Sequence, residues 1–530
     1  MKSVTFRKTA AMLLAGTMLC CTAGCENAGG NTQITLTARQ FADMLYQKIP
    51  FSENLNAQSA DTLGLLMNLT DFTDAAGYMA VGQIPDMAAV FVCEDAQKAA
   101  AMKPSLQAYL DEMIHEYERY APEQVDKLKN AVLQTAGNYA VMCITPDDKT
   151  AKAVIGEIFE TGESTYWDLR ALPADSNSQA PETTVTADTA WTGETTVSVP
   201  IATDVPAISD LPDGTNPTPS GEVVIPSQND YQTFGESVFR DGDTAFETFG
   251  FFDALSTRYA NTISGFADKM PDTVRVFSLL IPTSAGITLP DALVGKANVA
   301  DQKAAIEATS SKMSDKVHKV PLYDTLRSHR GEYIYFRTDH HWTALGAYYA
   351  FAEYCNAAGK SAPMLSEYKT KDFTGFLGSF YRDTNNSPIL GANPDVLTAY
   401  YTPHYDDIKL RFMDTKQKYY DWYLISDVTN YDASLKYNAF AGTDNPLVEV
   451  TNSAVTDGSV CILVKESFGN ALIPFLAEEY QYLYAFDYRH DSRDFQAFVK
   501  QHPSADVIFA NNISMLQGNY LTGKLASYVG

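Results

Sequence analysis

Two segments of the sequence carry side chains that could act together as a nucleophile and its base. Asp339, His340 and His341 follow one another in RTDHHWT, and Ser467 stands in KESFGN. An Asp two residues before a His on a loop can hold one ring nitrogen while the other takes a proton from a serine. If the loop begins extended, Asp339 and His341 point to the same side and His340 points away. These residues predict nucleophilic catalysis by Ser467, with His341 as general base and Asp339 orienting it.

Three other interpretations of the same residues stay open. A serine at the start of a helix is often only an N-cap. The run from Asp339 to His341 could hold a metal ion, although the C-terminal part of the sequence has no second Asp/His group at metal-ligand spacing. Both histidines could also be buried hydrogen-bonding residues. Because both segments occur together, each after an expected strand, we favour catalysis and expect no metal.

Strands and helices alternate from residue 231 to 530, and these elements must position the reactive side chains. Ser467 follows an apolar strand at 459–464, and Asp339 follows a short one at 333–336. The other expected strands lie at 274–281, 481–487 and 506–510, and the expected helices lie at 343–358, 470–480 and 491–501. Such βαβ units predict an α/β fold, a doubly wound parallel sheet of flavodoxin-like type. Ligands bind beyond the carboxyl ends of its strands, where the first N–H groups of a helix can stabilise an oxyanion.

The segment 34–170 predicts a small α+β domain before this sheet. Apolar, strand-like runs occupy 88–93 and 139–144. A helical stretch between them covers about 95–136, with a break near Pro122. Its one histidine, His115, stands among acidic residues and is expected on the solvated surface. This domain shows no Ser/His/Asp grouping, so we predict no catalytic chemistry for it.

Four cysteines follow the N-terminal segment, and none forms a pattern suited to zinc. Cys93 and Cys143 each belong to an apolar run of the small domain. A disulfide between them would suit an extracellular protein. Two small buried side chains on neighbouring strands are the favoured interpretation.

The segment 171–230 has the composition of a linker. It is rich in Pro, Thr, Ser and Asp, and no Lys or Arg occurs between Arg170 and Arg240. Such a segment buries too little apolar surface to offset its ordering entropy. We therefore expect a flexible, partly extended linker.

The N-terminus has the pattern of a bacterial lipoprotein signal. Basic residues within 1–8 precede an apolar stretch and the small residues Thr22-Ala23-Gly24, which lead to Cys25. We predict a signal peptide at 1–24, lipidation of Cys25 and a tether at 25–33. One diacyl anchor supplies the two chains that stable attachment needs. The protein is thus expected on the extracellular face of the cytoplasmic membrane, held by the lipid alone; plain secretion or an uncleaved anchor are the alternatives.

The composition limits the function classes. The chain has 530 residues, enough for two to four domains, and a net charge of −26. Because a nucleic-acid binder needs a basic stripe, this acidity argues against nucleic acid as a partner. After the signal, no apolar run approaches the ~20 residues of a membrane span. Neither GxGxxG after a strand nor a P-loop occurs, so no cofactor is expected.

Beyond these residue patterns, YFRTDHHWTALGAYYAF followed by LVKESFGNALIPFL and YAFDYRH resembles the DHHW family, over about residues 231–530. That family is related to the SGNH-like domains of the alginate O-acetylation proteins. The resemblance implies an SGNH-like domain with Ser467 as nucleophile, His341 as base and Asp339 as its partner. The candidates for oxyanion or substrate contacts are Phe468, Tyr488, Arg489 and His340, with Asn470 and Asn511 as weaker ones. Tyr488 could donate to the oxyanion and Arg489 could bind an anionic sugar or phosphate, and a purely structural role stays open for both. Glu466 stands where the family usually has Asp, which leaves the turn around Ser467 open.

The small domain is also similar to a known family. The sequence YLDEMIHEYERYAPEQVDKLKNAVLQTAGNYAVMCI resembles an uncharacterised domain of Gram-positive lipoproteins. The resemblance implies a fold and a location, but no activity.

Together these features predict a surface lipoprotein that transfers an acyl group, expected to be acetyl, to or from a cell-envelope polysaccharide. Transfer to water instead would make the domain an acetylesterase, since the same triad serves both reactions. Transferase activity implies a membrane-bound acyltransferase as acyl donor, because no part of the sequence can carry acyl groups across a membrane. The alternative is a non-catalytic carbohydrate-binding or scaffold lipoprotein.

Overall fold

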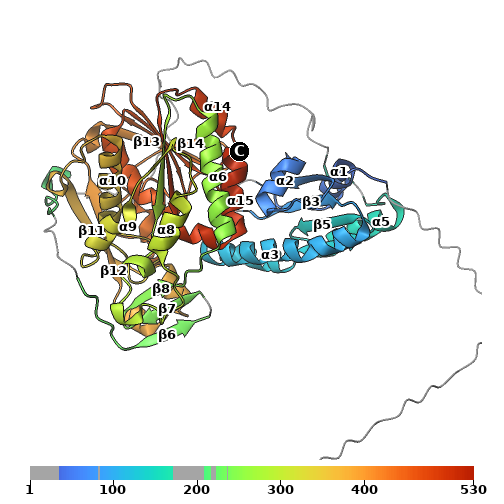
Figure 1. The fold of residues 1–530 in the computed structure, drawn as a ribbon, viewed down its shortest axis with the longest axis horizontal. Helices are drawn as coiled ribbons and strands as arrows, with labels where there is room; N and C mark the ends of the chain where they lie inside the picture. Colours follow the sequence, from blue (N-terminus) through green and yellow to red (C-terminus); the bar gives the residue numbers. More distant parts are fainter. Residues whose placement is uncertain (1–34, 81–83, 167, 171–207, 217–222, 236) are drawn as a thin grey trace, which may run out of the picture.

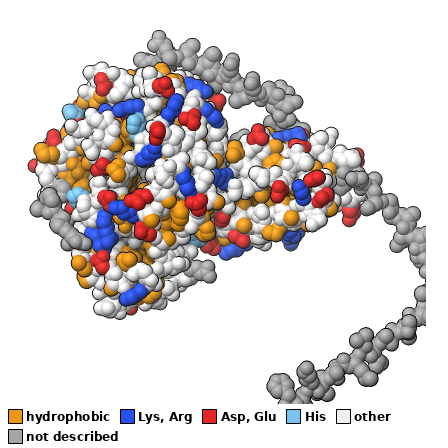
Figure 2. Space-filling model, in the orientation of Figure 1, with side chains coloured by type: hydrophobic (Ala, Val, Ile, Leu, Met, Phe, Trp, Pro, Cys, Tyr) orange, Lys and Arg blue, Asp and Glu red, His pale blue; other side chains and the backbone are white. Residues whose placement is uncertain are grey.

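A computed structural model describes residues 35–80, 84–166, 168–170, 208–216, 223–235 and 237–530. Figure 1 shows a small N-terminal domain beside a larger C-terminal domain. Within the described ranges, no helix combines the length and the apolar character needed to cross a bilayer. The signal peptide, Cys25, the tether and most of the linker lie outside these residues and stay predictions. On the face drawn in Figure 2, basic side chains are scattered among acidic and polar ones.

The N-terminal domain is a five-stranded antiparallel sheet with helices on both faces. Its strands are β1 (Asn56–Gln58), β2 (Asp74–Met79), β3 (Met87–Val92), β4 (Val132–Ala136) and β5 (Tyr139–Ile144), in the order β1-β2-β3-β5-β4. Its helices are α1 (Ala38–Lys48), α2 (Ala60–Met67), α3 (Ala96–Tyr120), α4 (Val125–Lys129) and α5 (Asp148–Thr161). Helices α1 and α5 pack on one face, and α2 and α3 on the other.

The helical stretch expected at 95–136 is shorter than predicted. It ends with α4, and its last five residues form β4, which pairs with β5. The reason is the Gly137-Asn138 turn, in which Gly137 has a φ of +54° and joins the two strands as a tight hairpin. Cys93 and Cys143 are both free and buried, on opposite faces of the sheet. The preference for two buried thiols over a disulfide is confirmed.

The C-terminal domain is built on an eight-stranded sheet that contains the predicted parallel core. Its order is β10-β9-β18-β16-β17-β15-β13-β14. Neighbours from β10 to β17 are parallel, and β15, β13 and β14 add an antiparallel edge. The strands are β9 (Arg275–Ile281), β10 (Val317–Lys319), β13 (Ile408–Met413), β14 (Tyr419–Trp422), β15 (Leu447–Asn452), β16 (Val460–Lys465), β17 (Tyr482–Asp487) and β18 (Asp506–Asn512). The doubly wound α/β fold with its parallel sheet is thus confirmed, and the antiparallel edge is an addition.

Helices cover both faces of this sheet, as its side chains require. In β16, Cys461 and Leu463 point into one core, and Ile462 and Val464 into the other. The first core also contains side chains of α9 (Leu322–Ser328), α10 (Ala344–Ala358) and α13 (Ile473–Glu479). The second core contains side chains of α6 (Asp253–Lys269), α8 (Gln302–Ser310), α14 (Phe495–Lys500) and α15 (Asn519–Val529). Short helices are α7 (Ser284–Ile287), α11 (Ser379–Asp383) and α12 (Pro388–Ala392). Two further sheets hold β6 (Tyr231–Phe234), β7 (Val238–Asp241) and β8 (Thr244–Glu247), and β11 (Lys369–Phe376) with β12 (Asp395–Tyr401).

Two sequence predictions differ from the observed C-terminal domain. Residues 333–336 form no strand, and only an isolated bridge joins Tyr335 to Trp342. Residues 208–216 and 223–230, assigned to the linker, lie on the C-terminal domain. Asp213 bridges to Lys369 there, and Leu211 packs against the first core. Apolar side chains and an ion pair hold these stretches in place, despite their linker-like composition.

Candidate active site

Ser467 lies on a tight turn at the carboxyl end of β16. The turn is a 3₁₀ helix, Ser467–Leu472, and Glu466 is its N-cap. The Glu466 carboxylate accepts hydrogen bonds from the amide of Phe468 at 3.0 Å and from the amide of Asn512 at 2.8 Å. Glu466 therefore ties the turn to the end of the neighbouring strand β18. Burial raises the pKa of Glu466, although these amides and Arg489 act in the opposite direction.

The structure brings Ser467, His341 and Asp339 together at this edge of the sheet. The Nε2 atom of His341 lies 2.7 Å from the Ser467 Oγ, and its Nδ1 lies 2.6 Å from Asp339 Oδ1. The same carboxylate oxygen accepts the His341 backbone amide at 3.0 Å. All three side chains are buried, with Ser467 only 3% exposed. This is the geometry in which an imidazole can accept the serine proton while a carboxylate holds its tautomer.

The loop that carries Asp339 and His341 is held by hydrogen bonds instead of a strand. The Asp395 carboxylate, fully buried at the start of β12, accepts from the amide and the hydroxyl of Thr338, each at 2.7 Å. The Ser379 amide, at the start of α11, donates to Asp339 Oδ2 at 2.8 Å. Trp342 donates through Nε1 to the Phe468 carbonyl at 3.0 Å. These bonds fix the Asp-His loop directly against the serine turn.

Electrostatics keep Asp339 ionised. Burial alone would raise the pKa of its carboxyl, but the imidazoles of His341 and His340 and the hydrogen bonds from His341 and Ser379 hold it well below its ordinary value. The Tyr437 ring stacks on the His341 ring, with centroids 3.9 Å apart and planes 11° apart. A stacked aromatic face fixes the plane of the imidazole. Both effects suit a base that becomes positively charged during the reaction.

Replacing Gly378 by alanine is expected to lower ester turnover about 10²-fold without unfolding the protein. A Cβ at Gly378 would lie 2.1 Å from Asp339 Oδ2, so the carboxylate would have to move away from His341. Turnover of a chromogenic acetyl ester and the far-ultraviolet circular dichroism spectrum would measure the effect. The matched control is Gly265→Ala in α6, where an added Cβ meets nothing within 4 Å. Equal turnover in the two variants would contradict the assigned position of Asp339.

The oxygen and nitrogen atoms of Asp339, His340 and His341 lie within 4.8 Å of one another, close enough to hold a metal ion. Both ring nitrogens of His341 already have protein partners, and His340 Nδ1 lies 2.6 Å from the Ser379 Oγ. Binding a metal through His341 would break one of these contacts. The arrangement therefore fits proton transfer better than metal binding.

The other candidates from the sequence have different surroundings. Arg489 and Asn470 line the cavity over the triad, and both bind Asp444, at 2.9 Å and 2.8 Å. Arg489 also forms two hydrogen bonds with Asp487, at 2.9 Å and 2.7 Å, so carboxylates already neutralise its charge. This pairing argues against its predicted role with an anionic sugar or phosphate. Asn511 is fully buried and accepts a hydrogen bond from Tyr259.

Two expected oxyanion contacts are corrected by the structure. Tyr488 packs in the second core, on the opposite side of the sheet from α10 and α13, and lines neither cavity described below. Its position follows from the alternation of side chains at the end of β17, which directs its neighbour Asp487 toward Arg489. The amides of Phe468 and Gly469 are both engaged by Glu466, through its carboxylate and its carbonyl. The carboxylate and the carbonyl of Glu466 therefore occupy the donors that the sequence assigned to an oxyanion.

A cavity of about 920 Å³ opens over the triad. Ser467, His341, Asp339 and His340 line it, together with Tyr437 and residues of both domains. His490 also lines it, and burial lowers the pKa of this histidine to about 4, so its ring is neutral at pH 7. The cavity gives the buried serine access to a substrate.

Sequence reasoning missed Tyr437, Ser379 and Asp444. Tyr437 lies in a 3₁₀ helix (Ala433–Ala439) and Asp444 in the loop after it, both between β14 and β15, and neither stands in a motif. Ser379 follows Gly378 at the start of a short helix, a common N-terminal pattern. Only the fold reveals that these residues face the triad.

Comparisons with known proteins found two matching family models and several similar solved structures. The family model described as DHHW protein matches residues 220–486, and the one described as Domain of unknown function (DUF4358) matches residues 64–145. A crystal structure of a DHHW family protein from Eubacterium siraeum is 29% identical, covers 55% of this chain and 96% of its own, and has a TM-score of 0.50. Bacillus cereus PatB1 with a sulfonyl adduct is 18% identical over 54% of this chain and 97% of its own, with a TM-score of 0.45. Pseudomonas aeruginosa AlgX is 13% identical over 55% of this chain and 66% of its own, with a TM-score of 0.30.

A search of curated proteins gave no match. The matched range 220–486 includes Asp339, His341 and Ser467, and it spans half of the chain. With a DUF4358 domain before it, the chain belongs to the DHHW family.

Proposed function

We propose that the C-terminal domain is a serine-dependent O-acyltransferase, with Ser467 as nucleophile, His341 as general base and Asp339 as the residue that orients the base. The observation that carries this proposal is the continuous chain of contacts from Asp339 Oδ1 through His341 to the Ser467 Oγ, at 2.6 Å and 2.7 Å. Surface serines seldom have a buried imidazole and a buried carboxylate in line behind them. The expectation that the acyl group is acetyl comes from the resemblance to the alginate O-acetylation proteins.

The reaction follows from these positions. The Ser467 Oγ attacks the acyl carbonyl of a donor ester while His341 Nε2 takes the serine proton. When the tetrahedral intermediate collapses, His341 returns this proton to the leaving alcohol, and an acyl-Ser467 ester remains. A hydroxyl of the acceptor then gives its proton to His341 and attacks that ester. When this second intermediate collapses, His341 returns the proton to the Ser467 Oγ, which gives the acylated acceptor and a free Ser467. Water as the acceptor gives hydrolysis instead.

The acceptor in this proposal is a cell-envelope polysaccharide, and the donor is a membrane-bound acyltransferase. Lipidation at Cys25 would place the domain on the extracellular face of the cytoplasmic membrane, beside both partners. Incorporation of labelled lipid into the wild-type chain, and its loss in Cys25→Ala, tests the anchor.

The deciding experiment is detection of an acyl-enzyme on the chain from residue 26 to 530. The protein would be mixed with a chromogenic acetyl ester, quenched in acid and analysed by intact mass and peptide mapping. We expect one added acetyl group on Ser467, and none in Ser467→Ala. Addition of glycan oligomers should then shorten the lifetime of the adduct and produce an acetylated oligomer.

The alternative function, a non-catalytic carbohydrate-binding or scaffold protein, predicts a different outcome. A well-folded protein would then give neither turnover nor an adduct, while glycan binding would persist. If water removes the acetyl group from Ser467 and no glycan acceptor does, the domain is an acetylesterase.

A further inference from the structure

A second cavity, of about 890 Å³, lies beside the one over the triad. The two cavities share His340, Arg489 and Tyr520 in their linings. The second one extends toward the N-terminal domain, where Asp111 and Glu118 of α3 form part of its wall. Figure 1 shows α3 reaching from the small domain to the larger one, next to α15. The N-terminal domain therefore forms part of the surface next to the triad.

The wall formed by α3 is fixed to the catalytic domain. The Glu112 carboxylate accepts hydrogen bonds from the amides of Asn519 and Tyr520, so a residue of α3 caps the first turn of α15. The ring of Tyr520 lies 5.9 Å from that of Tyr109. Helices α2 and α15 also approach closely, since a Cβ at Gly523 would lie 2.1 Å from the Leu66 carbonyl oxygen. These contacts between α3, α2 and α15 fix the position of α3 beside the cavity.

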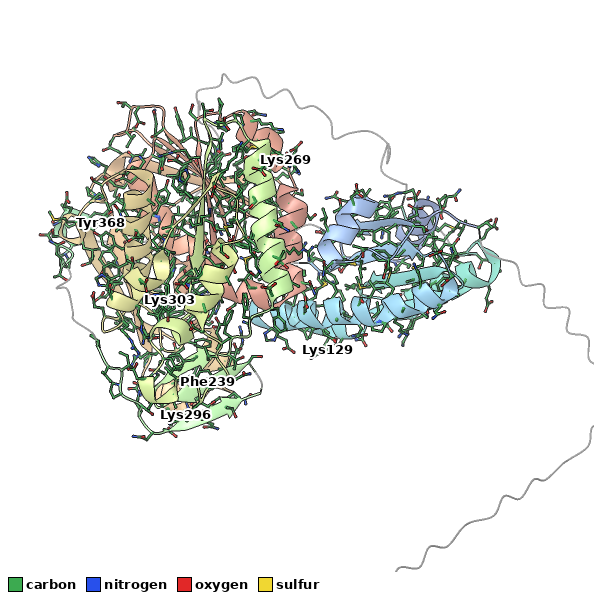
Figure 3. The ribbon with its side chains drawn as sticks, in the orientation of Figure 1. Lys129, Phe239, Lys269, Lys296, Lys303 and Tyr368 are labelled. Carbon is green, nitrogen blue, oxygen red and sulfur yellow. The ribbon has the colours of Figure 1, made fainter. Side chains whose placement is uncertain are left out.

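The second cavity is strongly acidic. One guanidinium lines it, that of Arg489, which is already bound to Asp487 and Asp444. The carboxylates that line it are those of Asp111, Glu112, Glu118, Glu247, Asp383 and Glu466. Lys129, labelled in Figure 3, lies 3.4 Å from Glu118 and offsets part of its charge, as Arg382 does for Asp383 at 2.9 Å. A polyanion would meet repulsion here, whereas a cation would be attracted.

One buried donor in the lining of this cavity has no acceptor within the described part of the chain. Asn512 is 6% exposed and lines the cavity at the end of β18. Its Oδ1 accepts the Ser514 amide at 2.7 Å, which fixes the orientation of the side-chain amide. Its Nδ2 has no acceptor among the residues that the structure describes. Since an unsatisfied buried N–H is unfavourable, a hydroxyl or ring oxygen of a bound sugar that accepts from it would stabilise the complex.

We infer that the second cavity is the acceptor subsite of the proposed acyltransferase and that it binds a glycan with free amino groups. Asn512 donates to a sugar oxygen, while Asp111 and Glu118 face the ammonium groups. Neutral glycans bind more weakly here, and polyanionic ones are rejected. The description of this cavity as the acceptor subsite rests on the proposed function, but glycan binding in the cavity does not require catalysis.

Binding would be measured by calorimetry on residues 26–530 carrying Ser467→Ala, so that no turnover occurs. The probes are a glucosamine tetramer, an N-acetylglucosamine tetramer and a galacturonate tetramer. We expect the glucosamine tetramer to bind most tightly and the galacturonate tetramer not to bind. The Asp111→Lys/Glu118→Lys variant should weaken glucosamine binding at least tenfold and change N-acetylglucosamine binding little. Asn512→Ala should weaken the binding of the glucosamine tetramer and of the N-acetylglucosamine tetramer about fivefold, which corresponds to the loss of one hydrogen bond.

The matched control is Glu94→Lys/Glu160→Lys, which makes the same charge change in the N-terminal domain at two exposed positions that line neither cavity. Equal glucosamine affinity in the two double variants would overturn the inference, as would preferred binding of galacturonate or no binding of any probe. Glucosamine binding without a Ser467 adduct would refute the proposed function and leave the subsite standing. An adduct without glucosamine binding would refute the subsite alone.

Discussion

Ester turnover is expected to fall about 10⁴-fold when Asp339 is replaced by asparagine. The carboxylate accepts three hydrogen bonds, from His341 Nδ1, the His341 amide and the Ser379 amide. An asparagine whose oxygen accepts from the Ser379 amide turns its own NH₂ group toward His341 Nδ1. The imidazole proton then moves to Nε2, and this nitrogen can no longer take the proton of Ser467.

The measurement is kcat for a chromogenic acetyl ester in Asp339→Asn, Ser467→Ala and the double variant. Because the residues act as one unit, the double variant should be no slower than Ser467→Ala alone. Asp272→Asn, at a position 90% exposed, controls for a surface Asp-to-Asn change. Turnover within tenfold of the wild type in Asp339→Asn would show that Asp339 does not orient the base.

The parts of the site that depend on local sequence were predictable. Asp339 and His341 are two residues apart, so the conformation of a single loop determines the distance between their side chains. Ser467 follows a strand whose apolar residues identify it as central in a parallel sheet. The edge of the sheet to which both belong then follows from the βαβ alternation.

The parts that depend on long-range packing were not predictable. Residues 334–336 are buried and apolar like a central strand, but their backbone bonds go to the Asp-His loop, as from the Thr343 amide to the Ile334 carbonyl. The Tyr437 ring reaches His341 from about a hundred residues away in the chain. No local pattern shows that α3 lies beside the triad, because the hydrogen bond between Glu112 and Tyr520 of α15 joins residues that are 408 positions apart in the sequence.

A buried charge cluster beneath the triad is expected to dominate the stability of the catalytic domain. Lys465 and Asp487 are both 0% exposed, and their charged atoms lie 3.3 Å apart. Arg489 binds Asp487 and Asp444, which gives two cations and two carboxylates. Replacing Asp487 by asparagine leaves one positive charge uncompensated in the interior. We expect a loss of about 3–5 kcal/mol in the free energy of unfolding.

Urea unfolding at pH 7 would measure this loss, with Asp272→Asn as the exposed control. Adding Lys465→Met to Asp487→Asn restores the balance of charge and should recover much of the stability. If the double variant is no more stable than the single one, lost packing and not charge is the cause.

The pH dependence provides an independent test of the same cluster. Burial alone would raise the pKa of Asp487, but Arg489 and Lys465 lower it to about 2. Because this value is below the ordinary pKa of about 3.9, the ionised carboxylate stabilises the fold fully above pH 4, and this contribution is lost as the pH falls from about 4 to 2. The difference in stability between wild type and Asp487→Asn should therefore be constant from pH 7 to 5 and shrink below pH 4. A difference that stays constant down to pH 2 would mean that the charge of Asp487 does not hold this part of the site together.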